Sequence, residues 1–214
     1  MEDLACLRTG DGLVDRIAET LIQRILRGEM PPGERLHQDG LAAAFAVSQG
    51  TIREAFRRIE ALKLAESLPR RGVRVAPLNA DGEREIAVMR ASLETLAVRS
   101  TVGPVNKARL KEIEAILRQG DAAEDLFESE ASNRAFHVAL ATQCRMPRLT
   151  AIIAELNLAY SRHVFASAAD RPWKPRYNFD HWRIFETYAA GNYDQSATLL
   201  ARHVRSVDRI SHAG

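Results

Sequence analysis

Apolar residues recur at helical spacing near the start of the chain and predict three consecutive helices. The first covers residues 13–27 and ends at Gly28, after which two consecutive prolines cannot continue a helix. A second, shorter helix fits residues 38–46. A third fits residues 48–62, and Ser48 is a good N-cap for it. The apolar positions of this third helix share one stripe: Ile52, Ala55, Phe56, Ile59 and Leu62.

A small β-hairpin is predicted after the third helix, with strands near residues 66–69 and 73–75 and Gly72 at the turn. The segment 78–82 then predicts a linker because it follows Pro77 and combines asparagine, aspartate and glycine. We therefore expect one domain over residues 1–77 and a second over residues 83–214.

The second domain is helical in pattern throughout, with breaks at glycine and proline and no strand-like alternation of useful length. Helices are predicted near residues 82–102, 105–119, 122–143, 148–167, 176–190 and 193–210. The expected fold is mainly α: an N-terminal winged helix-turn-helix followed by an all-α bundle.

The composition, the N-terminal residues and the cysteine spacing argue against membrane, secreted and disulfide-rich proteins. The chain has 214 residues, 46% of them hydrophobic, and no apolar run approaches the ~20 residues that a membrane helix needs. The N-terminal residues lack the features of a secretory signal, so we expect a cytoplasmic protein that does not enter a membrane. The two cysteines, Cys6 and Cys144, have no CxxC spacing and predict neither a disulfide framework nor a zinc ribbon.

Positive charge is concentrated in one region. Residues 48–76 hold seven basic and three acidic residues, a balance of +4, while the whole chain carries +2, so the remainder sums to −2. A local basic patch indicates an anionic partner for this region alone. The alternative is an ordinary solvated face.

The outer face of the third helix carries Gln49, Arg53 and Arg57. Two short helices joined by a tight turn, the second of them basic, predict a helix-turn-helix, and the hairpin supplies a wing. Arginine can bind a guanine edge or a phosphate, and glutamine can bind adenine. The wing residues Arg70, Arg71 and Arg74 can follow the adjoining DNA backbone. The alternative is a solvent-facing helix of a bundle that binds no DNA.

Four sequence segments occur in order between Leu13 and Val75: "RILRGEMPPGERL", "LAAAFAVS", "SQGTIREAFRRIEAL" and "PRRGVRV". This segment resembles the winged-helix domain of the GntR family of bacterial transcription regulators. The chain departs from the family pattern at Gln49, where arginine is usual, and at Lys63, where glycine is usual. With the resemblance, the predicted DNA-binding residues are Arg35, Ser48, Gln49, Thr51, Arg53, Arg57, Arg71 and Gly72.

The second domain contains histidines on three of its predicted helices. Asn133 and His137 are four residues apart on one helical face, His181 lies on the next-to-last helix and His203 on the last. Three imidazoles that converge in a bundle can ligate a divalent transition metal. The alternative is three unconnected histidines, since the chain has no short metal-binding motif.

Residues 83 to about 210 resemble the FCD ligand-binding domain of the FadR subfamily of GntR regulators. Members with a metal centre carry an acidic residue four positions before the first histidine, and here Asn133 replaces it. The resemblance implies zinc or nickel bound by Asn133, His137, His181 and His203, with Glu130 compensating in part for the missing charge. It also implies a small carboxylate on the metal, with Arg90 nearby; the alternative for Arg90 is a surface salt bridge with Glu94.

These observations predict a ligand-responsive transcription regulator, a repressor of a metabolic operon, that binds a palindromic double-stranded DNA operator as a homodimer. The expected effector is a small organic acid. Two alternatives remain open at this point: an architectural DNA-binding dimer without an effector, and a metal-dependent hydrolase. Against the hydrolase, no motif places a general base.

Overall fold

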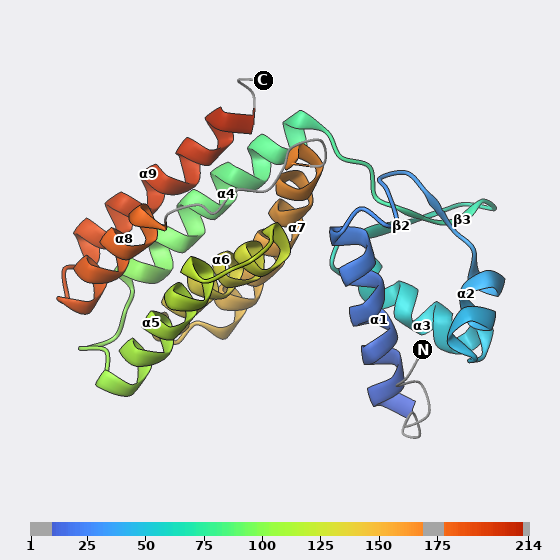
Figure 1. Ribbon diagram of the computed structural model, residues 1–214, viewed down its shortest axis with the longest axis horizontal. Helices are drawn as coiled ribbons and strands as arrows, with labels where there is room; N and C mark the ends of the chain where they lie inside the picture. The colour runs from blue at the N-terminus through green and yellow to red at the C-terminus, as the bar shows by residue number, and fades with distance from the viewer. Residues whose placement is uncertain (1–9, 169–177, 212–214) are drawn as a thin grey trace. The chain divides into compact units, whose positions relative to one another are not determined.

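The computed structural model describes residues 10–168 and 178–211 of the chain (Figure 1). The chain divides into two compact units between Leu78 and Asn79. The described residues form nine α-helices, one 3-10 helix and a three-stranded sheet, so the prediction of a mainly α fold is confirmed. None of the helices in these residues is long and apolar enough to cross a membrane.

The N-terminal unit consists of three helices and three short strands. They are α1 (Gly10–Leu26), β1 (Arg35–Leu36), α2 (Gln38–Phe45), α3 (Gln49–Ala61), β2 (Ala65–Leu68) and β3 (Gly72–Val75). The strands are antiparallel in the order β1-β3-β2. The hairpin of β2 and β3 was predicted, but β1 was not, because a strand of two residues is too short to show a periodic pattern.

Three turns of this unit place non-glycine residues in the left-handed region, at Ala46, Lys63 and Arg70. Ala46, between α2 and α3, has a φ of 52°, and Lys63, just after α3, has a φ of 58°. Lys63 stands where the family that the segment resembles usually has glycine, and it adopts the backbone conformation that glycine would adopt without a steric cost.

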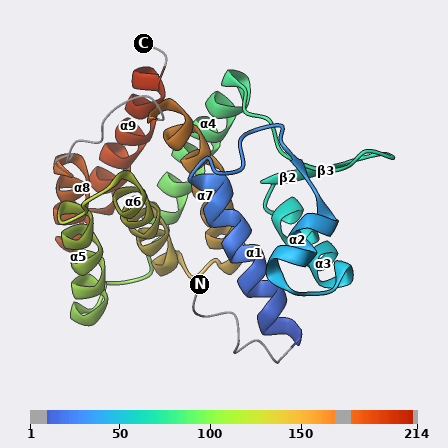
Figure 2. The same ribbon diagram turned by 45° about the vertical axis from the view of Figure 1, so that its right-hand side comes forward.

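The C-terminal unit consists of helices and one 3-10 turn. They are α4 (Ala80–Arg99), α5 (Lys107–Asp121), α6 (Leu126–Ala141), η1 (Thr142–Cys144), α7 (Pro147–Ala168), α8 (Phe179–Ala189) and α9 (Tyr193–Ser211). Helix α4 packs along α9 and α7, and α5 packs against α6 (Figures 1 and 2). The predicted linker 78–82 was wrong in part. Its last three residues belong to α4, because the Asn79 side chain accepts a hydrogen bond from the Gly82 N–H and caps the helix.

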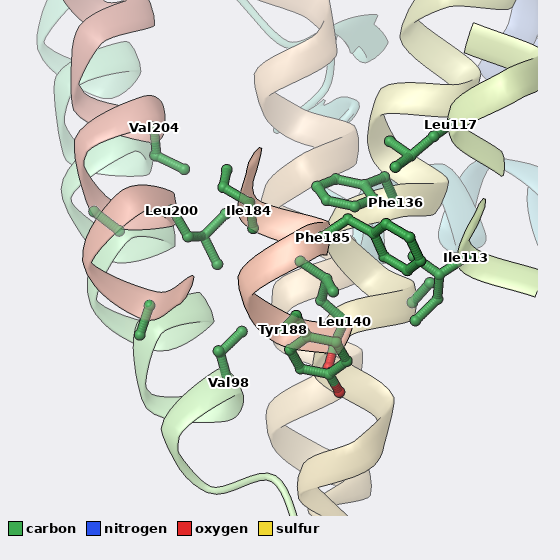
Figure 3. Packing of buried hydrophobic residues seen from close by; sticks show 13 residues of the cluster. Val98, Ile113, Leu117, Phe136, Leu140, Ile184, Phe185, Tyr188, Leu200 and Val204 are labelled. Atoms are coloured by element: carbon green, nitrogen blue, oxygen red, sulfur yellow. The ribbon is translucent and has the colours of Figure 1, made fainter. Parts of the chain in front are cut away.

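A continuous apolar core joins α4, α5, α6, α8 and α9 (Figure 3). Phe136, Ile184 and Val204 belong to this core. His137 and His203 are the chain neighbours of Phe136 and Val204, and His181 precedes Ile184 by one helical turn. The packing that buries these apolar side chains therefore also turns the three histidines toward the interior.

Candidate DNA interface and metal centre

Helix α3 is anchored by its apolar stripe. Ile52, Ala55 and Ile59 have no exposed surface, and Phe56 is 3% exposed. Ser48 is the N-cap, and its side chain accepts a hydrogen bond from the Thr51 N–H at 3.1 Å, so the predicted cap is confirmed. Because the inward face is fixed in this way, the opposite face of α3 points away from the packed core of its unit.

The polar residues of that face differ in whether their side chains already bind other protein groups. Arg53 is exposed, and its side chain makes no hydrogen bond or ion pair within the described residues. Arg57 pairs with Glu54 at 2.6 Å. Gln49 donates to Asp39 of α2 at 2.7 Å. Arg53 is thus available as it stands, whereas Arg57 and Gln49 must exchange protein partners for nucleic acid.

The sheet positions two further predicted residues close together. Gly72 has a φ of 81°, and a Cβ atom built there would lie 3.7 Å from the Arg35 guanidinium. Arg71 is exposed in the turn before β3. Arg74, expected to serve the wing, pairs with Glu66 across β2 and β3 at 2.6 Å. Arg35, Arg71 and Gly72 therefore share the end of the wing.

The structure brings the three predicted histidines together. Ligand atoms of His137, His181 and His203 all lie within 4.8 Å of one another. The ring centroids are 5.4 Å apart for His137 and His181, 5.6 Å for His137 and His203, and 4.4 Å for His181 and His203. Imidazole nitrogens from three helices at this spacing can hold one transition-metal ion.

The hydrogen bonds of the cluster leave ring nitrogens for a ligand. The Nδ1 atom of His137 lies 2.6 Å from Glu94 Oε2, and that of His181 lies 3.2 Å from Asn178 Oδ1. The Nε2 atoms of His137 and His181 are buried without a hydrogen-bond partner among the described residues. Buried polar atoms are normally paired, so these two nitrogens fit a cation between them.

Burial keeps two of the histidines neutral. It lowers the pKa of His181 well below its ordinary value, and the neighbouring His203 and His137 lower it further. Burial also lowers the pKa of His203 to about 4, with Asp180, whose Oδ2 lies 3.6 Å from His203 Nδ1, acting in the opposite direction. Neutral imidazole is the form that binds metal, so a cation displaces few protons at neutral pH.

A buried carboxylate, Glu94, contacts the histidine cluster through His137. It is 1% exposed and accepts hydrogen bonds from Arg90 Nε at 2.8 Å and from Asn157 Nδ2 at 2.9 Å, in addition to its contact with His137. Burial would raise the pKa of Glu94, but the charge of Arg90 and the hydrogen bonds from Arg90 and His137 outweigh it and hold this pKa well below its ordinary value. A carboxylate on Nδ1 fixes the imidazole so that Nε2 faces the ligand.

Only part of the role of Arg90, and none of the role of Glu94, was predicted from the sequence. The Arg90–Glu94 ion pair forms, as the alternative reading expected, but it is buried rather than at the surface, with Arg90 4% exposed. The Arg90 guanidinium also lies 4.9 Å from the centroid of the Tyr160 ring. The only sequence signal for Glu94 was its spacing of four residues from Arg90.

A cavity of about 170 Å³ adjoins the histidines, and Arg90, Glu130 and Asn133 also line it. Glu130 is not part of the histidine cluster. It accepts hydrogen bonds from Asn133 Nδ2 at 3.1 Å and from Ser161 Oγ at 2.7 Å. That Glu130 compensates in part for the missing charge stays a prediction. Its hydrogen bond holds the Asn133 amide with Nδ2 toward Glu130, so Oδ1 is the amide atom that remains for a metal.

Two family models match the chain in the same order as its two units. The model described as bacterial regulatory proteins, gntR family, matches residues 13–75, and the FCD domain model matches residues 85–206. The chain belongs to the GntR family and carries an FCD domain. This GntR protein is therefore a transcription regulator and not an enzyme.

Relatives and solved structures agree with this assignment. The GntR protein is 25% identical to the HTH-type transcriptional regulator BphR of Paraburkholderia xenovorans, over 91% of this chain and 83% of the relative. It is 42% identical to the galactonate operon transcriptional repressor of Escherichia coli over 30% of this chain and 29% of the relative. A GntR regulator from Rhodococcus shares the fold, with a TM-score of 0.79, 23% identity, and coverage of 95% of this chain and 99% of that one.

Proposed function

We propose that the protein is an effector-responsive repressor of a metabolic operon that binds a palindromic operator as a homodimer. In this proposal α3 enters the major groove, where Arg53 reads a base edge, while Arg57 and Gln49 exchange their protein partners for DNA. Arg35, Arg71 and Gly72 contact the adjoining backbone, and Ser48 and Thr51 fix the start of the reading helix. The exposed, unpaired Arg53 on a firmly anchored helix supports this assignment.

The helical domain is proposed to hold a divalent transition metal, zinc or nickel. His137, His181 and His203 supply imidazole nitrogens, and Asn133 supplies an amide oxygen from the same cavity. The observation that carries this proposal is the pair of buried, unpartnered Nε2 atoms. When bound, the metal supplies positive charge for the carboxylate of an effector.

Arg90 is proposed to orient the effector. Its Nε is engaged by Glu94, and its guanidinium reaches the cavity that the histidines line. A guanidinium matches a carboxylate in geometry and charge. The cavity volume of about 170 Å³ corresponds to about six water molecules at liquid density, so we propose an organic acid of few carbon atoms.

Arg90 and Glu94 both lie on α4, which begins two residues after the boundary between the units. An effector that engages Arg90 therefore acts on the helix nearest to the connection with the DNA-binding unit. It changes operator binding only if it prefers one of two arrangements of the dimer.

The experiment is a thermal-shift screen on protein reloaded with zinc or nickel, using sugar acids, hydroxy acids, dicarboxylates and amino acids. Acids that stabilise the protein are then added to an operator-binding assay by fluorescence anisotropy. The expected result is a change in operator affinity that requires both the metal and Arg90, tested with Arg90→Lys as the conservative variant. Specific operator binding that no metal and no acid alters would contradict the effector role and favour an architectural DNA-binding dimer.

A further inference from the structure

Helix α5 ends on two residues that are locally unfavourable for a helix end. Gly120 is a poor helix former, and it does not adopt the left-handed conformation that favours glycine at such an end. The carboxylate of Asp121, the last residue of α5, lies at the negative end of the helix dipole. Local choices that oppose their own element are expected at functional sites. Here both residues lie against Asn178, the residue that precedes α8.

Gly120 leaves room for the Asn178 side chain. It is buried, and a Cβ atom built on it would lie 2.8 Å from Asn178 Nδ2 and 3.2 Å from Ser132 Cβ. A methyl group at position 120 would therefore push the Asn178 amide aside. The glycine is explained by the close approach of this amide to α5.

The Asp121 carboxylate accepts two hydrogen bonds from the start of α8. Asn178 Nδ2 donates to Oδ1 at 3.0 Å, and Trp182 Nε1 donates to Oδ2 at 2.8 Å. Asn178 is the N-cap residue of α8, but its side chain makes no capping hydrogen bond. Its amide instead lies between Asp121 and His181, whose Nδ1 is 3.2 Å from Asn178 Oδ1.

The chemistry of Asp121 sets the direction of each hydrogen bond in this series. A carboxylate can only accept, so Asn178 turns its NH₂ group toward Asp121 and its carbonyl oxygen toward His181. A carbonyl oxygen can also only accept, so the neutral His181 ring carries its proton on Nδ1. Nε2 is then bare, and Nε2 is the atom of His181 that is buried without a hydrogen-bond partner among the described residues.

We propose that Asp121 is a positioning residue for the metal centre, which acts through Asn178 to hold His181 with a bare Nε2 toward the other two histidines. This role rests on the proposed metal centre and belongs to residues that would not touch the metal. Glu94 contacts Nδ1 of His137 directly, whereas the Asp121 carboxylate acts on His181 through one intervening amide. Groups of this kind orient the metal ligands that they hold.

The first test reverses the Asn178 amide. In Asp121→Asn the new side chain accepts from Trp182 through its oxygen, so its NH₂ group faces Asn178, and the Asn178 amide must turn over. His181 then faces an NH₂ group, which favours the tautomer with the proton on Nε2, the atom that must be bare to bind metal. We expect zinc affinity, titrated by calorimetry into chelator-treated protein, to fall about tenfold. Glu112→Ala, which removes another exposed acid of α5, is the matched control and should leave the affinity unchanged.

The second test restores the hydrogen bonds with the two groups exchanged. In the double variant Asp121→Asn, Asn178→Asp, the amide at position 121 accepts from Trp182 and donates to the carboxylate at position 178. That carboxylate accepts from Nδ1 of His181, so the ring keeps its proton there. We expect the double variant to recover the zinc affinity of wild type.

The tautomer itself is measured in metal-free protein by long-range proton–nitrogen correlation NMR with isotope-labelled histidine, and His181→Gln assigns the signals. We expect the Nδ1–H form of His181 in wild type and in the double variant, and the Nε2–H form in Asp121→Asn. An Asp121→Asn protein with the tautomer and zinc affinity of wild type would overturn this role and leave the proposed metal centre standing. A wild-type protein that binds no zinc would overturn both.

Discussion

The two units handle polar side chains in opposite ways. In the N-terminal unit the residues proposed to bind a ligand are exposed, and the buried surface of α3 is apolar. In the C-terminal unit the proposed ligand-binding residues are buried or half-buried, with His137 1%, Arg90 4% and His181 7% exposed. A large anion such as DNA binds at the protein surface, where a charged side chain stays hydrated and needs no buried partner. A small ion or acid is enclosed, where each polar contact is stronger but an unpaired group is costly.

This difference in burial also determines how firmly the ligand-binding side chains of each unit are held before a ligand binds. Arg57 and Gln49 are held by exposed partners that water and DNA can replace, so their contacts add little stability. His137 is held by a buried carboxylate that is itself fixed by Arg90 and Asn157. We therefore expect substitutions at the DNA face to change binding without unfolding the protein, and substitutions around the metal centre to change both.

The largest effect is expected at the DNA face. Arg53→Ala should weaken specific operator binding by about 1–3 kcal/mol, because this arginine is free to contact a base. Arg57→Ala should cost less, since the ion pair with Glu54 must be given up before Arg57 reaches DNA. Lys111→Ala, which removes an exposed charge from the other unit, is the control. Fluorescence anisotropy titrations with operator and random DNA measure all three; equal losses for Arg53→Ala and Lys111→Ala would refute a base-reading role.

A smaller effect is expected when a charge is added to the metal centre. Asn133→Asp should raise zinc affinity by about tenfold, or about 1.4 kcal/mol, because a carboxylate attracts a cation more than an amide does. The metal-free variant should be less stable than wild type, since the new carboxylate would face Glu130, which accepts the Asn133 amide hydrogen at 3.1 Å. Calorimetry and thermal denaturation, with Asn133→Ala as control, give both values. Zinc affinity that Asn133→Asp leaves unchanged would remove residue 133 from the ligand set.

The turn after α3 offers a stabilising substitution. Lys63 has a φ of 58°, a conformation that is unfavourable for residues with a Cβ atom. Lys63→Gly should therefore raise the free energy of unfolding by about 0.5–1 kcal/mol. Lys63→Ala keeps the Cβ atom and removes the charge, so it separates the two causes. Urea denaturation that shows the same gain for both variants would assign the effect to charge.

The smallest effect concerns pH. Burial lowers the pKa of His163, while Glu83, 3.5 Å away, acts in the opposite direction. Below about pH 6.5, the ordinary histidine pKa, the unfolded chain binds this proton more readily than the folded chain, so stability falls as pH falls. His163→Gln removes this contribution, so its loss of stability between pH 7.5 and 5.5 should be smaller than that of wild type. Identical losses for metal-free wild type and variant would contradict the assignment.

The fold followed from the sequence wherever its signals were local. The apolar stripe of α3, its Ser48 cap and the helical breaks of the second unit all lie within a few residues of one another, and the structure confirms them. The two-residue strand β1 did not follow, because its partner on β3 lies far along the chain. The resemblance showed that Lys63 replaces the usual glycine. Only the structure shows, through the φ of Lys63, that this residue adopts the left-handed conformation, which is unfavourable for a residue with a Cβ atom.

The candidate metal centre was less accessible to sequence reasoning. Spacing alone placed histidines on three helices, and only the resemblance to a known domain indicated that they converge. The contact between Glu94 and His137 joins residues 43 positions apart, and no periodic pattern encodes such a distance. The burial of the Arg90–Glu94 pair was also hidden, because a spacing of four is equally typical of surface salt bridges.

The central claim, that the buried histidines of the helical unit form a metal-dependent effector site, is tested most directly by titrating zinc into chelator-treated protein in a calorimeter. The account predicts about one tight zinc site per wild-type chain. It also predicts at least hundredfold weaker binding by the double variant His137→Ala, His181→Ala, whose fold is checked by circular dichroism. Zinc binding by a folded double variant with the affinity of wild type would contradict it.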